Sequence, residues 1–390
     1  MSSWVETFPG NLRWTNAIQI VKGMVPYNNT SAEQIDRIAR RMQARHAAGE
    51  DQDRIWREEW SRMAQWNERQ ADEAAAKGRQ MTAGNFYLRA GNYYYQAERF
   101  VQPGEEKMAI YRKALRCWRA GLERRYPHIR RVDVPYENSA LCACWLPAEG
   151  AGGKAPALVI FNGMDNCKEM NVVFAGLEFS RRGMHVLAID GPGQGESLRM
   201  NGIASRPDYE VAGTAAFDYL EKSHPEVDLK RVTVMGYSFG GYLAPRIAGC
   251  EKRYAGCVAF GAMHWDLHGW QRGIKEALAR DPKSSFSSQF QFRWVIGAPD
   301  NDAAMERAKQ FSLEGVADRI ACPTLVMHGE NDRIVPVEEA RTLYEKIGAS
   351  NKTLKIYTEE DGGAEHCQVD DRPMGIDYMA DWIAENVNKA

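Results

Sequence analysis

The residues most able to do chemistry in this chain gather around one serine. Ser238 lies in the pentapeptide GYSFG at residues 236–240, which has the pattern G-x-S-x-G. An apolar, β-branched run at residues 231–235 precedes it, and a helix-like run at residues 241–248 follows it. A sharp strand-to-helix turn of this kind projects the serine hydroxyl away from a sheet, and glycines avoid collisions beside it. The pattern also occurs in structural turns, but this context predicts a nucleophilic serine.

Two residues further along the chain could activate that hydroxyl. Asp332 follows one strand-like run, and His366 lies in a glycine-rich loop after another. Glu330 is a competitor for the acid, but the spacing H-G-x-x-D-x-x-V-P favours Asp332. The chain order Ser, Asp, His is that of α/β-hydrolases and differs from the order in chymotrypsin or subtilisin. We therefore predict a triad in which His366 removes the proton of Ser238 and Asp332 orients the imidazole.

Attack of a serine on a carbonyl carbon creates an anionic oxygen, which needs N–H donors already in place. We expect one donor to be the backbone N–H of Phe239, directly after the nucleophile. The other is expected in the loop at residues 162–165, which follows a strand-like run at residues 157–161, and Met164 N–H is the candidate. His328 precedes the acid loop, and we expect it to pack against or support that loop.

The overall composition is that of a globular protein and limits the classes of partner. The net charge of −2 gives no electrostatic argument for binding nucleic acid or an anionic membrane. The eight cysteines include no C-x-x-C pair and no His/Cys cluster has zinc spacing, so we expect reduced thiols, no metal and no cofactor. Residues 1–14 lack the basic start and apolar core of a signal peptide, and no apolar run approaches a membrane span. We therefore expect a cytoplasmic protein with a small-molecule substrate.

One glycine-rich run invites a nucleotide-binding interpretation. Residues 190–196 read DGPGQGE, with glycines at G-x-G-x-G spacing. The third glycine of a dinucleotide motif is replaced by Glu196, and Pro192 occupies the tight turn. We therefore expect a loop that shapes the fold beside the active site.

The elements that must position these residues fall into two parts, and the first is helical. Residues 1–128 are rich in Arg, Glu, Gln, Ala and aromatic residues and have few strand-like runs. Ser31 and Gln34 form a capping-box pattern at the start of one predicted helix. Trp56, Trp60 and Met63 share one face of another. We predict an all-helical N-terminal lid domain, with further helices at residues 52–77, 82–100 and 104–126.

The second part, residues 129–390, alternates strand-like runs with helix-like runs. This alternation predicts a mostly parallel sheet flanked by helices, the α/β-hydrolase fold. Predicted helices include residues 168–182 and 208–222. The predicted strands are residues 131–134, 140–146, 157–161, 185–190, 231–235, 257–260, 323–327 and 353–357.

The segment at residues 263–313 is longer than a plain crossover needs, and we expect a helical insertion there that forms a lid. Its first residues should border the nucleophile. His264, Trp265 and Asp266 are therefore candidates for substrate contact, with packing of the insertion on the core as the alternative.

Several of these runs together resemble a known group. The chain is similar to α/β-hydrolases related to 2,6-dihydroxypseudooxynicotine hydrolase, the fungal polyketide-shortening hydrolases and the bacterial fermentation-respiration switch proteins. The resemblance implies triad roles for Ser238, Asp332 and His366, helices that roof the pocket, and a possible homodimer. It also implies an acidic substrate-orienting residue, with Asp266 as a possible counterpart, and aromatic β-diketone or aryl ketone substrates. The residues that carry it are 162–165 with 168–169, 190–196, 236–241, 328–336 and 365–367.

Three functional hypotheses remain open at this point. The first is a cofactor-free serine hydrolase that cleaves a C–C bond next to a ketone in an aromatic or polyketide-like compound. The second is hydrolysis of an ester, lactone or amide, which needs the same triad. The third, from a different class, is a non-catalytic regulator or binding protein built on this fold.

Overall fold

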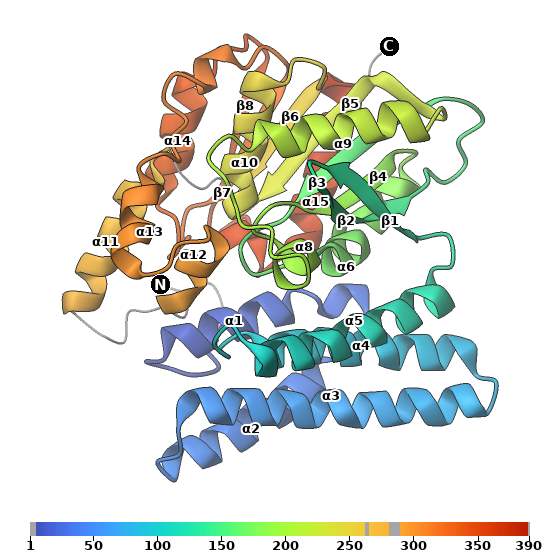
Figure 1. Cartoon of the computed structure of the whole chain (residues 1–390), viewed down its shortest axis with the longest axis vertical. Coiled ribbons are helices and arrows are strands. Elements are labelled where there is room, and N and C mark those ends of the chain that lie inside the picture. The colour runs from blue at the N-terminus through green and yellow to red at the C-terminus, as the bar shows by residue number, and fades with distance from the viewer. Residues whose placement is uncertain (1–4, 262–264, 281–288, 389–390) are drawn as a thin grey trace. The chain divides into compact units, whose positions relative to one another are not determined.

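The computed structural model describes residues 5–261, 265–280 and 289–388. The chain divides into two compact units, one over Glu6–Arg130 and a larger one that contains Arg131–Ala390. Figure 1 shows helices alone in the first unit, and a sheet with helices in the second. His264, a predicted substrate contact, lies outside the described residues.

The first unit is built on three long helices whose aromatic faces meet. Helix α4 packs against both α3 and α5. Trp56 and Trp60 are fully buried and Met63 nearly so, which confirms the predicted apolar face. A Cβ on Gly91 would come within 2.5 Å of the Trp118 ring, so α4 and α5 approach more closely than another residue would allow. The helices are α1 (Leu12–Lys22), α2 (Ala32–Ala47), α3 (Gln52–Ala76), α4 (Gln80–Glu98) and α5 (Glu105–Arg125).

Two local features of this unit differ from expectation. Helix α1 was not predicted, because its apolar pattern is interrupted by Thr15, Asn16 and Gln19, which are buried along with its apolar residues. The capping box at the start of α2 was also wrong. Ser31 is the N-cap but makes no side-chain capping bond, and Gln34 instead accepts hydrogen bonds inside the unit, one from Tyr93 at 2.8 Å.

The second unit contains, within the described residues, one eight-stranded sheet in the order β1-β2-β4-β3-β5-β6-β7-β8. Strand β2 pairs antiparallel with β4, and every pair from β4 through β3 to β8 is parallel. The carboxyl ends of these parallel strands share one edge of the sheet, where open α/β sheets carry their sites. The strands are β1 (Arg130–Tyr136), β2 (Ser139–Leu146), β3 (Ala155–Phe161), β4 (His185–Asp190), β5 (Val227–Tyr237), β6 (Gly256–Phe260), β7 (Thr324–Gly329) and β8 (Lys352–Tyr357).

Helices cover both faces of the sheet (Figure 1). Alternate strand residues such as Val159, Val234 and Ala259 pack with α9 and α10 in the main apolar core. On the other face Gly375 of α15 approaches Met327 of β7, at 3.4 Å from a Cβ placed on the glycine. The helices are α8 (Gly195–Arg199), α9 (Glu210–Ser223), α10 (Phe239–Cys250), α14 (Val337–Lys346) and α15 (Arg372–Asn386), with 3₁₀ turns η4 (Ala317–Arg319) and η5 (His366–Gln368).

The single helix predicted at residues 168–182 is interrupted in its middle. The structure has α6 (Lys168–Asn171), a π-helical turn η2 (Val172–Gly176) and α7 (Leu177–Arg181). The wider turn follows Asn171 directly, and the side chain of Asn171 is held by Asn162 and Tyr237. Such π turns are frequent where a helix serves a functional site.

The segment expected to be a helical insertion contains helices in its described parts. Leu267 and Val295 are fully buried and belong to the main apolar core of the unit. These ends of the insertion therefore pack onto the core. The helices are α11 (Leu267–Arg280), α12 (Gln289–Val295) and α13 (Asn301–Ala308).

Candidate active site

Ser238 occupies a strained turn between β5 and α10. Its backbone has φ 56° and ψ −122°, a conformation that costs energy for a residue with a side chain. Its N–H donates to the Phe260 carbonyl at 2.9 Å. A Cβ on Gly236 would lie 2.0 Å from the Gly240 oxygen, and one on Gly240 would lie 2.8 Å from the Asn162 oxygen. The turn can close only because both flanking residues are glycines.

The structure brings the imidazole of His366 to this hydroxyl. His366 Nε2 lies 2.9 Å from Ser238 Oγ, and its Nδ1 lies 2.6 Å from Asp332 Oδ2. The two residues after the histidine, Cys367 and Gln368, have positive φ and form a tight turn. Cys367 packs against the end of β6, because a Cβ on Gly261 would come within 2.4 Å of its sulfur. This packing holds the turn, and with it the backbone of His366, against the end of β6.

Asp332 is held in the loop after β7 by contacts of its own. Its Oδ1 accepts hydrogen bonds from the N–H groups of Ile334 at 2.8 Å and Val335 at 2.9 Å. His328 is fully buried, with Nε2 2.9 Å from the Val335 oxygen and 3.3 Å from Asp332 Oδ2. This position supports the acid loop, as expected. The competing acid Glu330 is exposed and accepts the N–H of Glu359 instead.

The electrostatics of the three groups follow from burial and mutual contact. Burial lowers the pKa of His366, but the Asp332 carboxylate and the neighbouring Cys367 together raise it, so that this pKa lies well above its usual value. Burial raises the pKa of Asp332, yet its partners, the His366 imidazole foremost, lower it overall. Burial lowers the pKa of His328, which keeps this ring neutral. The arrangement favours an imidazolium beside an ionised carboxylate, the charge state a triad passes through during reaction.

The predicted oxyanion loop lies against the serine. A Cβ on Gly163 would be 2.9 Å from Ser238 Cβ and 3.3 Å from Ser238 Oγ, so only glycine permits this approach. Met164 follows, half-buried, and its carbonyl accepts a hydrogen bond from Gln291 at 3.2 Å. Phe239 is the first residue of α10, whose N-terminus carries a partial positive charge. The predicted donor Phe239 therefore follows Ser238 directly, and the predicted donor Met164 follows Gly163, which contacts Ser238.

Two of the three predicted substrate contacts can be placed. Asp266 Oδ1 accepts the N–H of His268 at 3.1 Å at the start of α11, and its backbone pairs with Ser312. Trp265 is half-buried and donates its N–H to Glu339 at 2.7 Å. Burial raises the pKa of Glu339, and the charge of Asp266 raises it further. These hydrogen bonds join Trp265 to Glu339 and Asp266 to His268, and neither partner belongs to the candidate triad.

Several buried polar side chains beside the candidate triad were not predicted individually, although residues 190–196 were expected to shape the fold beside the active site. Asp190 is fully buried at the end of β4, and Gln194 is nearly so in the loop after it. Tyr237 precedes the nucleophile and donates to the Asn171 side chain, which in turn donates to Asn162. The available signal was the position of polar residues at the carboxyl ends of fully apolar strands.

Comparison with known proteins places this geometry in a family. Residues 173–390 match the prolyl oligopeptidase family. The hydrolase acrC of Aspergillus aculeatus is 28% identical over 377 residues, covering 85% of this chain and 87% of that protein. The α/β-hydrolase gkaG of Penicillium citrinum is 31% identical over 70% of this chain and 72% of its own. The 2,6-dihydropseudooxynicotine hydrolase of Paenarthrobacter nicotinovorans is 27% identical, over 84% and 83% of the two chains.

A solved structure supports the same assignment of fold. The crystal structure of the 2,6-dihydroxy-pseudo-oxynicotine hydrolase superposes with a TM-score of 0.74 and 23% identity, and the match covers 94% of this chain and 95% of that one. In the described part of the chain, no helix has the length and apolar character required to cross a bilayer. The chain belongs to the prolyl oligopeptidase family and is an α/β-hydrolase.

Proposed function

We propose that the protein is a cofactor-free serine hydrolase in which Ser238, His366 and Asp332 act as the catalytic triad. The observation that carries this proposal is the continuous contact from Asp332 Oδ2 to His366 Nδ1 at 2.6 Å and from His366 Nε2 to Ser238 Oγ at 2.9 Å. Both distances suit proton transfer by a positioned base.

The first half-reaction forms an acyl-enzyme. Ser238 Oγ attacks a carbonyl carbon while its proton passes to His366 Nε2, and Asp332 stabilises the resulting imidazolium. The carbonyl oxygen becomes an anion that accepts hydrogen bonds from the N–H groups of Phe239 and Met164. The bond to the leaving group then breaks, and His366 returns the proton to that group. When the leaving atom is carbon, it departs as an enol or carbanion stabilised by a neighbouring ketone.

The second half-reaction regenerates the serine. A water molecule gives a proton to His366 and attacks the acyl carbon, and the second tetrahedral intermediate is held by the same N–H donors. Collapse releases a carboxylic acid and returns the proton to Ser238 Oγ. The complete reaction consumes one water and needs no redox partner.

The proposed substrate is a ketone-bearing aromatic or polyketide-like compound cleaved at a C–C bond. Support comes from kinship over most of the chain with 2,6-dihydropseudooxynicotine hydrolase. The same triad would hydrolyse an ester, lactone or amide, whose leaving groups need no neighbouring ketone. A regulator without catalysis on this fold would need no relay between the three side chains.

A substrate panel separates these functions. Purified protein is assayed with aromatic β-diketones and with p-nitrophenyl esters, and with Ser238→Ala protein as the blank. The proposal predicts serine-dependent release of a carboxylic acid and a ketone from a diketone. Rapid ester turnover without diketone cleavage would replace the C–C assignment by an esterase. No serine-dependent turnover of either class would favour the binding function.

A further inference from the structure

The oxyanion loop, residues 162–165 and the residues up to Lys168, contains a glycine that cannot by itself fix the backbone. Residue 163 must be glycine, because a Cβ there would collide with Ser238. Glycine leaves both backbone dihedrals soft, so by itself it cannot fix the direction of the next N–H, that of Met164. The N–H donors that bind the oxyanion form the oxyanion hole. If one of these donors is mobile, the hole is no longer preorganised and lowers the reaction barrier less. The loop therefore needs anchors on both sides of Gly163.

The first anchor is the side-chain amide of Gln194. Its Oε1 accepts hydrogen bonds from the N–H of Asn162 at 3.2 Å and the N–H of Gly191 at 3.0 Å. Its Nε2 donates to the Asn162 carbonyl. One buried amide thus holds both backbone groups of the residue before Gly163. Because the Asn162 carbonyl belongs to the peptide that leads into Gly163, its direction is fixed.

The second anchor is the carboxylate of Asp190. Its Oδ1 accepts the backbone N–H of Lys168, at the far end of the loop, at 2.7 Å, and also accepts the side-chain amide of Asn162. Its Oδ2 accepts the N–H of Glu196 at 2.8 Å. A Cβ on Gly195 would lie 2.1 Å from this carboxylate, so the glycine permits Glu196 to reach it. One carboxylate therefore ties both ends of the loop to the DGPGQGE run.

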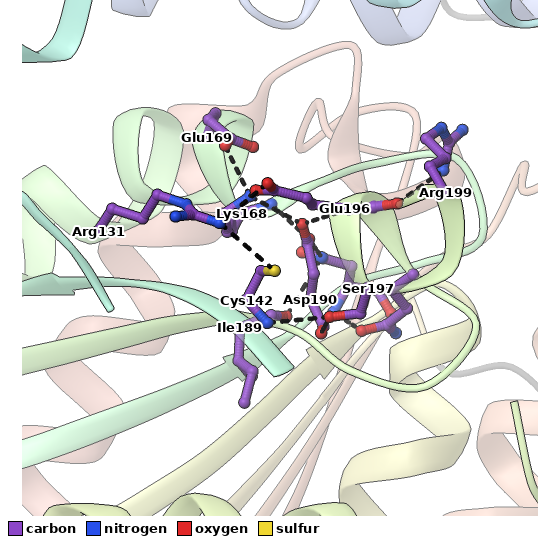
Figure 2. Close-up of polar contacts among 12 residues, drawn as sticks. Arg131, Cys142, Lys168, Glu169, Ile189, Asp190, Glu196, Ser197 and Arg199 are labelled. Atoms are coloured by element: carbon purple, nitrogen blue, oxygen red, sulfur yellow. Dashed lines mark hydrogen bonds and ion pairs between the residues drawn. The ribbon is translucent and has the colours of Figure 1, made fainter. Parts of the chain in front are cut away.

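A buried lysine neutralises this carboxylate. The Lys168 ammonium lies 3.2 Å from Asp190, 2.7 Å from Glu196 and 2.7 Å from Glu169, and it is fully buried (Figure 2). Arg131 also pairs with Glu196, at 3.0 Å (Figure 2). Burial raises the pKa of Glu169, which reduces the excess of negative charge around one ammonium. Buried ionic groups of this kind are weak evidence for stability and better evidence for fixed position.

We propose that the DGPGQGE run is a clamp for the oxyanion loop and that Gln194 is its principal positioning residue. The clamp comprises Asp190, Gln194 and Glu196 with Lys168. This inference rests on the proposed function, since it assumes that the loop at Gly163 serves Ser238 in catalysis. It gives a catalytic purpose to a glycine-rich run that lacks the spacing for a nucleotide.

The first test replaces Gln194 by methionine, which keeps the volume and removes all three hydrogen bonds. We expect the rate of Ser238 labelling by a fluorophosphonate, and kcat on p-nitrophenyl butyrate, to fall about 10- to 100-fold, somewhat less than for loss of a whole oxyanion donor. KM should change less than about threefold, because the ground state does not use the hole. The matched control is Gln34→Met, which removes a buried, hydrogen-bonded glutamine from the helical unit and should leave these rates unchanged.

The second test uses Gln194→Glu and keeps the inference open to refutation if the methionine variant does not fold. An ionised carboxylate can accept from Asn162 and Gly191 but cannot donate to the Asn162 carbonyl, whereas a protonated carboxyl can do both. The activity of this variant relative to wild type should therefore rise as pH falls from about 8 to about 6, since burial raises the pKa of the introduced carboxyl. The neighbouring charged groups, Asp190, Lys168, Glu196 and Glu169, are common to Gln194→Glu and the wild type, so the introduced carboxyl is the one added titrating group.

The outcomes distinguish the inference from the function beneath it. Wild-type protein that folds but does not react with the fluorophosphonate would overturn the proposed function and the clamp together. Reactive wild-type protein with equal rates for Gln194→Met and for wild type would overturn the clamp alone. A relative activity of Gln194→Glu that stays flat or falls with decreasing pH would also overturn it.

Discussion

The two units of this chain each bury a lysine completely, and they use it differently. In the helical unit Lys107 of α5 pairs with Glu98, the last residue of α4, and donates to the carbonyls of Glu98 at 2.7 Å and Val101 at 3.2 Å. These partners lie within nine positions of Lys107 in the chain. Lys168 of the hydrolase unit pairs with its neighbour Glu169 and also with two distant residues, Asp190 at the end of β4 and Glu196 in α8.

The difference distinguishes a fold contact, which only stabilises its unit, from a site contact, which also positions residues of the candidate active site. Lys107 satisfies carbonyls at the end of a helix, so its effect should be confined to the stability of the helical unit. Lys168 pairs with Asp190, which holds Asn162 next to the glycine that approaches Ser238, so the effect of Lys168 should extend to the reaction. The same chemical group, equally buried, is therefore expected to give different kinetic results in the two units.

The largest expected effect is the loss of kcat in Ser238→Ala, against which the kcat values of the lysine variants can be compared. Ser238→Ala removes the nucleophile and should lower kcat about 10⁶-fold, as loss of a triad serine does in other hydrolases. The free energy of unfolding should change little, since the side chain is small and alanine keeps the same Cβ in the strained turn. Steady-state kinetics and urea unfolding measure both quantities. A kcat within about tenfold of wild type would show that Ser238 is not the nucleophile and would contradict the proposed triad.

The acid of the triad should give the next largest effect. Asp332→Asn should lower kcat about 10⁴-fold, because the amide favours the wrong tautomer of His366. It should also shift the acidic limb of the pH–rate profile. In wild type that limb should lie above about pH 6.5, the ordinary pKa of histidine, because Asp332 raises the pKa of His366 and only neutral His366 is a base. Without the carboxylate the limb should move to lower pH; an unmoved limb would contradict this assignment.

The two lysines can then be compared directly. Lys168→Met and Lys107→Met should each cost about 3–5 kcal/mol of unfolding free energy, because each leaves a buried carboxylate unpaired. Only Lys168→Met should also lower kcat, by about 10- to 100-fold at a temperature where the protein is still folded. Urea unfolding and kcat on a p-nitrophenyl ester measure the pair. Equal kcat values for the two variants would erase the distinction between fold contact and site contact.

The fold class and the three candidate triad residues could be predicted from the sequence, whereas the contacts of the two buried lysines could not, for a physical reason. Ser238, Asp332 and His366 each follow a strand whose apolar pattern is local, so the local motifs and the chain order were enough to nominate them. The hydrogen bonds of Gln194 and Asp190 join loops that meet only after the sheet forms. The capping box at Ser31 failed for a similar reason, because Tyr93 of another helix engages Gln34.

The smallest expected effect concerns a carboxylate outside both lysine clusters. Asp266→Asn keeps the oxygen that accepts the N–H of His268, so the start of α11 should persist and stability should hardly change. If Asp266 orients substrate, KM should rise about threefold to tenfold through one weakened hydrogen bond, with kcat unaffected. Kinetics with an aromatic ketone substrate measure the change. An unchanged KM would assign Asp266 to the start of the helix alone.

The central claim, that Ser238 is activated by His366, is tested most directly by mapping a fluorophosphonate adduct on folded protein. The account predicts one adduct, on the peptide that contains Ser238, formed rapidly by wild type and at least about 10³-fold more slowly by His366→Gln. An adduct on a different serine, or labelling of Ser238 at the same rate in His366→Gln, would contradict the account.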